Sequence, residues 1–392
     1  MADRRFGFDP ERFKSLGRQQ PGIISRMLEH DETPVAKGFT EIKVVGVGGG
    51  GNNTVNRMIQ ADVRGIDFVA VNSDAQALNH SLSEHRLQIG RRLTKGLGSG
   101  GRPEAGERAA MESATEIERE LEGAHMVFVT AGMGGGTGTG AAPIVADIAR
   151  RQGALTVGIV TRPFQFEGAR RAQAAEEGLK RMKDAVDALI VVPNERLLTL
   201  AGRGTTMVEA FRIADDVLHQ GIRGIADLVL IPGVINLDFA DVYAVMHDAG
   251  SALMSLGEAS GPSRAKIAAQ AAIDSALLET SIEGAKGVLL NISGGQDLAL
   301  AEVHEAAQFV ADVVDPDANI IFGAVLNPNL EGQFKITLIA TGFDQGYSPR
   351  ARKDHRASAP EPRASSDRTP VPDRPRPSAA DLDVPAFLRR RQ

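Results

Sequence analysis

The most informative segment of the chain is Gly134-Gly135-Gly136-Thr137-Gly138-Thr139-Gly140. It follows the apolar run Met126–Val129 and precedes a helical pattern that opens with Ala141-Ala142-Pro143. Successive glycine N–H groups and two threonine hydroxyls form a concave nest for an anion. The N-terminus of the helix adds a positive dipole end, and proline near a first helical turn costs no hydrogen bond. The stretch therefore predicts a phosphate-binding loop between a strand and a helix.

A second glycine-rich stretch, Gly46-Val47-Gly48-Gly49-Gly50-Gly51-Asn52-Asn53, lies nearer the N-terminus. It follows the apolar run Ile42–Val47 and precedes a helical pattern at Thr54–Ile59. Its spacing fits a dinucleotide-binding turn, but tight packing of a strand on a helix would need the same glycines. Neither stretch has the P-loop pattern of glycine, four residues, glycine, lysine and a hydroxyl residue. Phosphate charge must then be met by backbone donors, helix dipoles, a metal ion or an arginine.

Around these two stretches, residues 39–200 alternate short apolar runs with helical patterns. The runs lack polar alternation, which is typical of parallel strands covered on both faces. This alternation predicts a doubly wound α/β sheet with helices between its strands. The expected strands are Ile42–Val47, Phe68–Val71, Met126–Val129, Leu155–Val160 and Leu189–Val192, and the expected helices include Pro143–Gln152 and Arg171–Ala185.

The remaining patterns predict a second, smaller α+β domain joined to the first by a long helix. Apolar residues recur at spacings of three and four from about Thr205 to Ile222, which indicates an amphipathic helix. Beyond it we expect helices at 263–278 and 298–314 and strands at Val288–Ile292, Asn319–Val325 and Phe334–Thr341. The predicted organisation is a flexible N-terminal extension at 1–38, a nucleotide-binding α/β domain at 39–204, a central helix at 205–225, an α+β domain at 226–343, a disordered linker at 344–380 and a terminal peptide at 381–392.

The linker and the terminal peptide differ in composition. Residues 344–380 are rich in proline, arginine and serine, and cannot bury enough apolar surface to fold. The chain then ends in an apolar cluster followed by Arg389, Arg390 and Arg391. Such a cluster on a tether is either a frayed terminus or a partner-binding peptide, and we favour the peptide, with Val384, Pro385, Phe387 and Leu388 as its binding residues.

Composition excludes several classes of function. With 44 Lys plus Arg against 50 Asp plus Glu among 392 residues, the net charge of −6 gives no reason to expect a nucleic acid partner. The absence of cysteine excludes disulfides, thiol nucleophiles and cysteine-ligated metals. No apolar stretch is long enough for a transmembrane helix, and the N-terminus does not have the pattern of a secretory signal. We therefore expect a cytoplasmic protein.

The motifs together resemble the tubulin/FtsZ family of GTPases. GGGTGTG at Gly134–Gly140 is similar to the family signature, and VVGVGGGGNN is similar to the N-terminal loop of its bacterial members. Further similarities, in the order of the family, are VNSDAQAL at Val71–Leu78, TRPFQFEGARR at Thr161–Arg171, VPNERLL at Val192–Leu198, NLDFADV at Asn236–Val242 and the terminal VPAFLRRR at Val384–Arg391.

The resemblance implies a tubulin-like fold and a site for GTP or GDP, with Mg²⁺, at the C-terminal ends of the strands. It implies that Phe211 stacks on guanine and that Asp215 accepts hydrogen bonds from the N1–H and the 2-amino group of the base. It implies a ribose-side pair, Glu167 and Arg171, whose spacing of four would place them on one helical face. The implied GTP-binding residues are Gly49, Gly50, Gly51, Asn52, Asn53, Asn72, Gly134, Gly135, Gly136, Thr137, Gly138, Thr139, Glu167, Arg171, Phe211 and Asp215.

The resemblance also implies catalysis between subunits. Alone, Asp238 and Asp241 predict a helix N-terminal cap with an acidic first turn. In the family, the two aspartates enter the nucleotide site of the next subunit and position the attacking water. Head-to-tail contacts of this kind generate filaments. The implied function is that of a GTPase polymerising into the cytokinetic ring of bacterial cell division, recruited to the inner membrane face at midcell by tethering partners such as FtsA.

Two other functions remain open from the sequence. A specialised paralogue would act as a nucleotide-binding filament scaffold or regulator, and would differ in turnover. A dinucleotide-dependent oxidoreductase is motivated by Gly46, Gly48 and Gly51, but it needs an acidic residue about 20 residues further on. Here Asp74 comes later than that, and the loop at Gly134–Gly140 would have no role.

Overall fold

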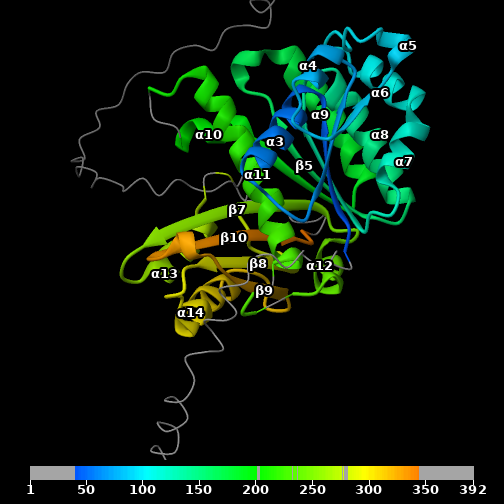
Figure 1. Ribbon diagram of the computed structural model, residues 1–392. Coiled ribbons are helices and arrows are strands. Elements are labelled where there is room, and N and C mark those ends of the chain that lie inside the picture. The colour runs from blue at the N-terminus through cyan, green and yellow to red at the C-terminus, as the bar shows by residue number, and fades with distance from the viewer. Residues whose placement is uncertain are drawn as a thin grey trace, which may run out of the picture. The chain divides into compact units, whose positions relative to one another are not determined.

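Parallel strands form the N-terminal half of the molecule (Figure 1). The computed structural model describes residues 40–200, 204–231, 233–235, 237–275, 277 and 281–343. Within them the strands pair in the order β3-β2-β1-β4-β5-β6, every pair parallel. This confirms the doubly wound sheet. The bounds are β1 (Ile42–Val47), β2 (Asp67–Asn72), β3 (His85–Gln88), β4 (Met126–Gly132), β5 (Leu155–Arg162) and β6 (Ala188–Pro193).

Helices cover both faces of this sheet, which explains why its strands are continuously apolar. Val44 packs in one core with Ile222, and the next residue, Val45, packs in another core with Val145. The helices on the Val44 side include α3 (Gly48–Gln60) and α11 (Met207–Leu230). Those on the Val45 side are α6 (Pro103–Glu112), α7 (Ala114–Leu121), α8 (Thr137–Arg151) and α9 (Ala169–Ala185). Shorter helices are α4 (Ala75–Asn79), α5 (Arg91–Thr94) and α10 (Asn194–Leu200).

The C-terminal half is the expected α+β unit, and it continues the same sheet through a strand that the sequence patterns did not predict. This strand, β7, pairs in parallel with β6 and antiparallel with β10, beyond which β8 and β9 follow. The expected helices are shorter than predicted, ending at Ile273 and Ala311. The bounds are α12 (Phe239–Met246), β7 (Gly250–Ser260), α13 (Arg264–Ile273), β8 (Gly287–Gly294), α14 (Leu300–Ala311), β9 (Asn319–Leu326) and β10 (Gln333–Thr341).

The long helix α11 begins near the expected position and runs further than predicted. Thr206 and Glu209 form a reciprocal capping box at its start. The helix continues to Leu230 because its apolar face does, with Ile225 and Leu228 both buried. At the helical rise of 1.5 Å per residue its length is roughly 36 Å. One helix therefore contacts strands of both the N-terminal half and the C-terminal half.

Both glycine-rich stretches form the first turns of helices, so the predicted helix starts were wrong. α3 begins at Gly48 and α8 at Thr137, which places Pro143 in the interior of its helix. The glycines are there because the backbones lie too close together for side chains. A Cβ on Gly51 would lie 2.2 Å from the Thr130 carbonyl oxygen, and one on Gly140 only 1.9 Å from that of Pro103.

The predicted N-terminal extension, linker and terminal peptide lie outside the described residues. None of the helices in the described ranges combines the length and the apolar character that a membrane span requires.

Candidate functional site

The two glycine-rich turns lie at the one place where the strand order of the parallel sheet reverses. β1 pairs with β2 on one side and with β4 on the other, and the turns follow the C-terminal ends of β1 and β4. Open α/β sheets bind ligands in the crevice at this switch point. Helix α3 starts directly after β1, and α8 starts close after β4. Two helix N-termini, each with unpaired N–H groups, therefore meet at one crevice.

The turns touch each other through their backbones and remain open at two positions. Gly48 has a φ of +73°, and a Cβ there would lie 2.7 Å from the Gly138 backbone nitrogen. A Cβ on Gly50 would lie 3.1 Å from the nitrogen of Gly132. Gly49 and Gly135, in contrast, have no heavy atom within 4 Å of that position. The crevice is thus walled by main chain and leaves room for a ligand at these two glycines.

The threonine hydroxyls of the second turn are engaged with the protein. Thr139 Oγ1 accepts a hydrogen bond of 2.8 Å from the Gly134 N–H. Thr137 Oγ1 lies 2.7 Å from Ser73 Oγ and 3.1 Å from Ser99 Oγ, and all three side chains are buried. These bonds fix the shape of the turn. The donors left for a phosphate are chiefly the backbone N–H groups of the two helix starts.

The three expected asparagines divide into two structural residues and one accessible residue. Asn52 is buried, and its side-chain amide lies 2.9 Å from the carbonyl oxygen of Gly46 and 2.7 Å from that of Gly48, which orients its nitrogen toward both. Asn72 is buried, and its Oδ1 accepts from the Asp74 N–H at 3.1 Å. Asn53 is exposed in the second turn of α3, where a ligand at the crevice could contact it.

A third glycine-rich loop, not predicted from the sequence, lies against the second turn. Its glycines at 96, 98, 100 and 101 all have positive φ. Its Ser99 packs so closely that a Cβ on Gly136 would lie 2.1 Å from Ser99 Oγ. The density of glycine just before Pro103, the first residue of α6, was the signal that could have revealed it. A cavity of about 340 Å³ beside this loop has arginines among its lining residues, with Gly100, Gly101, Arg102, Gly134, Arg170 and Arg171 contributing.

Phe211 belongs to an aromatic cluster beside the expected ribose-side pair. Its ring meets those of Phe164 and Phe166 edge-on, with centroids 5.3 Å and 6.4 Å away. The side chain is 39% exposed, so a ring face is available for a planar base. A residue of the core would be less exposed than this.

Glu167 and Arg171 form an ion pair. The prediction that they lie on one helical face is wrong. Glu167 ends a 3₁₀ turn, whereas Arg171 lies in α9. Between them Gly168 has a φ of +96°, which breaks the helix. A backbone hydrogen bond fixes the Glu167 side chain, because its Oε1 accepts from the Phe164 N–H at 3.0 Å. The main chain of Arg171 also packs under Gly134.

Asp215 lies one turn after Phe211 on α11 and is partly buried. Burial raises the pKa of Asp215 to about 7, with the Asp216 carboxylate adding to the effect and the Arg57 guanidinium opposing it. Arg57 is itself committed to Asp216, with Nε 2.9 Å from Oδ1, which ties α3 to α11. A carboxylate desolvated in this way gains strongly from hydrogen-bond donors, and guanine presents two of them side by side.

Asp238 and Asp241 lie at the other end of α11, away from the crevice. Asp238 caps α12 by accepting from the Asp241 N–H at 2.9 Å, and Asp241 Oδ2 faces the Asp238 N–H at 3.4 Å. The predicted helix cap is thus confirmed. From Asp215 to the end of α11 at Leu230 the helix alone spans roughly 22 Å. Within one chain the two aspartates are not brought to the glycine-rich turns.

Comparison with known proteins points to one family. Residues 41–202 match the tubulin/FtsZ family GTPase domain, and residues 250–344 match the FtsZ family C-terminal domain. An empty FtsZ dimer from M. jannaschii is 40% identical, with 90% of this chain and 99% of that chain covered and a TM-score of 0.76. CetZ1 from Haloferax volcanii, solved as a GDP-bound monomer, has the same fold at 20% identity, with 78% and 95% covered and a TM-score of 0.67.

Proposed function

The chain belongs to the tubulin/FtsZ family of GTPases, and we propose that it assembles head to tail into filaments that hydrolyse GTP between subunits. The observation that carries this proposal is the separation of two incomplete sites. The turns at Gly46–Asn53 and Gly134–Gly140 offer main-chain donors for phosphates, and neither segment contains a carboxylate of its own that could activate water. The exposed Asp238 and the partly exposed Asp241 lie beyond the far end of α11.

GTP fits the crevice from the phosphates to the base. The N-termini of α3 and α8 supply N–H donors and positive dipole ends for the phosphates, with room at Gly49 and Gly135. Phe211 would stack on the base, and the ionised Asp215 would accept from it. Adenine has no matching pair of donors, so Asp215 selects guanine. The dinucleotide-dependent oxidoreductase is wrong, because the matched domain is that of a GTPase.

Mg²⁺ belongs to the same proposal. It keeps several waters and is usually held by phosphate oxygens plus one or two carboxylates, and it offsets the negative charge of the phosphates. The Ser73 hydroxyl contacts Thr137, and the next residue, Asp74, is the carboxylate that we propose as a ligand of the ion. In the described residues no group of three metal-ligating side chains occurs at the glycine-rich turns. The nucleotide itself would therefore supply most of the ligands.

Hydrolysis would use the aspartates of the next subunit. The helix cap engages Asp238 Oδ1 and Asp241 Oδ2, so each carboxylate keeps its second oxygen for a water molecule. Asp241 would orient the attacking water toward the terminal phosphate, and Asp238 would hold Asp241 in place through the cap. The capping geometry fixes both side chains before the subunits meet, which is how positioning lowers a barrier.

Assembly follows from this arrangement. The nucleotide surface and the aspartate surface lie at opposite ends of α11. When two subunits join, one of them keeps its nucleotide surface free and the other keeps its aspartate surface free. A contact between two different surfaces does not close on itself and continues as a filament. The related M. jannaschii FtsZ was solved as a dimer, which supports self-association here.

The cellular role that we propose is the cytokinetic ring of dividing bacteria. The protein would work in the cytoplasm, recruited to the inner membrane face at midcell. Residues Val384, Pro385, Phe387 and Leu388, outside the described ranges, would bind membrane-tethering partners such as FtsA. Deleting residues 382–392 should leave polymerisation intact and abolish recruitment to partner-coated vesicles. Loss of polymerisation would show that the tail belongs to the folded body.

The alternative is a specialised paralogue that binds nucleotide as a filament scaffold or regulator. The two functions differ in turnover, so phosphate release measured over a range of protein concentrations separates them. Shared catalysis predicts that turnover per subunit rises steeply above a critical concentration of the protein. A paralogue of the scaffold kind would assemble with GTP and release little phosphate. Turnover independent of concentration would contradict the proposal itself.

A further inference from the structure

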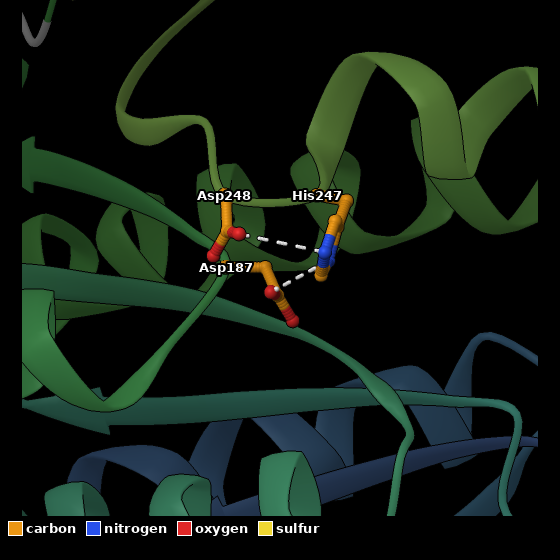
Figure 2. Close-up of side chains that lie close together, drawn as sticks. All are labelled: Asp187, His247 and Asp248. Atoms are coloured by element: carbon orange, nitrogen blue, oxygen red, sulfur yellow. Dashed lines mark ion pairs between the residues drawn. The ribbon is translucent and has the colours of Figure 1, made fainter.

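Three side chains with metal-ligating atoms converge at the end of the sheet opposite to the nucleotide crevice. Asp187 directly precedes β6, His247 follows the last residue of α12, and Asp248 comes next (Figure 2). His247 Nδ1 lies 3.0 Å from Asp187 Oδ1, and His247 Nε2 lies 3.5 Å from Asp248 Oδ2. One ligand atom from each residue can be chosen so that all lie within 4.8 Å of one another.

Asp187 is a buried carboxylate with one unsatisfied oxygen. Its side chain is only 2% exposed, and Oδ2 accepts a 2.9 Å hydrogen bond from the Thr156 N–H. Oδ1 is buried and accepts no hydrogen bond from the described residues, although it has ion-pair neighbours. A buried charge of this kind is costly unless a cation is well placed to meet it. Figure 2 shows the carboxylate turned toward His247.

Arg150 is the cation already next to Asp187, but it neutralises the charge of this carboxylate only in part. Its Nε lies 3.4 Å from Asp187 Oδ1, while its Nη2 is bonded to Asp248 Oδ1. One guanidinium faces two carboxylates, so with a neutral His247 the group keeps a charge of about −1. The Arg150 side chain is 38% exposed and long enough to turn into solvent. The site can therefore exchange this cation for another.

We propose that Asp187, His247 and Asp248 bind a divalent transition-metal ion of the zinc and cobalt class. One imidazole nitrogen and two carboxylate oxygens are three ligands of the type such ions accept, with a fourth position left for water. The Thr156 N–H orients Asp187 from behind, as groups around a metal site commonly do. Tyr243 stacks on His247, with ring centroids 4.6 Å apart, and holds its plane.

The site differs from the magnesium expected with the nucleotide. Magnesium and calcium prefer oxygen ligands, so the imidazole of His247 selects against them. The ion would join the start of β6 to the C-terminus of α12, the helix whose N-terminus carries Asp238. The proposal goes beyond GTP hydrolysis and does not depend on it, because metal binding is measured directly on the nucleotide-free protein.

The first experiment titrates nucleotide-free protein with Co²⁺, followed by visible absorption, and with Zn²⁺, followed by calorimetry, both in excess Mg²⁺. We expect one strong site, weakened about tenfold or more by His247→Ala and by Asp248→Asn. The matched control is His85→Ala, since His85 pairs with the single carboxylate of Glu120 at 2.7 Å. This control should bind as the wild type does. Equal binding by His247→Ala and the wild type would overturn the proposal.

A second variant distinguishes a metal site from a plain ion-pair network. Arg150→Gln removes the competing cation and should tighten Zn²⁺ binding, and Zn²⁺ should then raise the melting temperature more than it does in the wild type. An ion-pair network without a metal role predicts that Arg150→Gln only lowers stability and that Zn²⁺ leaves the melting temperature unchanged. That result would also overturn the proposal. Melting of each variant without metal shows that it is folded.

Discussion

The two ends of α11 differ in the groups that they present: main chain at one end and carboxylate side chains at the other. At its N-terminal end the nucleotide crevice is built from main chain, where Gly51 and Gly140 leave no space for a Cβ. At its C-terminal end, the surface around Asp238 and Asp241 depends on two carboxylates at a helix cap that are not deeply buried. In our proposal the first end binds the nucleotide within one chain. The second presents its chemistry outward.

This contrast underlies the proposal that one chain binds GTP without forming the complete active site. The proposed phosphate donors are backbone N–H groups at Gly48–Asn53 and Thr137–Gly140, two segments without an acidic or basic side chain. The carboxylates could activate water but lie roughly 22 Å or more away along α11. Substitutions at one end should therefore change affinity, and substitutions at the other should change turnover. The predictions below test that division.

The largest effect is expected at the aspartate end. Asp241→Asn should lower GTP turnover about 100-fold or more, because a group that orients or deprotonates water commonly contributes that much. GTP affinity and filament formation should remain, since Asp241 makes no contact with the crevice of its own chain. Phosphate release and nucleotide binding on the same sample measure both. The control is Asp62→Asn, an exposed carboxylate paired only with Arg64 in the described contacts. Unchanged turnover in Asp241→Asn would remove the role given to this residue.

At the crevice end, a matched glycine pair separates folding from binding. Gly135→Ala meets no protein atom within 4 Å, so its melting temperature should stay near that of the wild type. Its added methyl occupies space expected for GTP, and affinity should fall about tenfold, or 1.4 kcal/mol. Gly140→Ala would place a Cβ 1.9 Å from the Pro103 carbonyl oxygen and should melt several degrees lower. Normal GTP affinity in Gly135→Ala would show that the phosphates lie elsewhere.

The third prediction concerns pH and Asp215. Burial raises the pKa of Asp215 from 3.8 to about 7, so the ionised form that accepts from guanine is lost as pH falls through 7. From the ionised fractions, GTP affinity should drop about tenfold between pH 8 and pH 6. Asp215→Asn should flatten this dependence and reduce the preference for GTP over ATP. A pH profile unaffected by Asp215→Asn would exclude the carboxylate from base recognition.

The same shift has a consequence for stability in the nucleotide-free protein. Because the folded-state pKa is raised, the folded chain binds more protons than the unfolded chain between pH 3.8 and about 7. The stabilisation is present at low pH and is lost as pH rises through that window. Comparing denaturation of the wild type and Asp215→Asn over this range isolates the contribution of Asp215 from those of other groups.

The smallest effect is expected at the ribose-side pair. The Arg171 side chain is 57% exposed, although that of Glu167 is only 11% exposed. Solvent screens an exposed guanidinium, so Arg171→Ala should weaken GTP binding by about fivefold or less. The main chain of Arg171 under Gly134 is kept in this variant. A loss as large as that of Gly135→Ala would mean that Arg171 contacts the phosphates directly.

Local patterns were enough to predict the crevice end. The apolar runs at Ile42–Val47 and Met126–Val129 are buried on both faces, and glycine density marks the turns that follow. The same glycines made the helix starts hard to predict. Glycine usually indicates a loop, yet Gly51 and Gly140 lie inside helices, where close backbone packing leaves no room for a side chain. The loop at residues 96–101 carries the same signal more weakly, with Ser99 and other residues between its glycines.

Features assembled from distant segments were not predictable. Strand β7 mixes small, polar and apolar residues, because its exposed and buried positions are interspersed, and so it lacks a continuous apolar run. Asp187 and His247 are separated by sixty positions in the sequence, and only the pairing of β6 with β7 brings their segments together. The burial that raises the pKa of Asp215 likewise comes from tertiary packing, so no local sequence pattern marks this residue.

The central claim, that each active site is completed by a second copy, is tested most directly by mixing two defective variants. Asp241→Asn keeps the crevice but lacks the catalytic carboxylate, while Gly135→Ala keeps Asp241 but binds GTP weakly. At a GTP concentration that fills mainly the first variant, each contact in which its crevice faces Asp241 of the second variant has both halves intact. We expect the mixture to release phosphate faster than the sum of the separate variants. A rate equal to that sum would show that each chain hydrolyses GTP with its own residues.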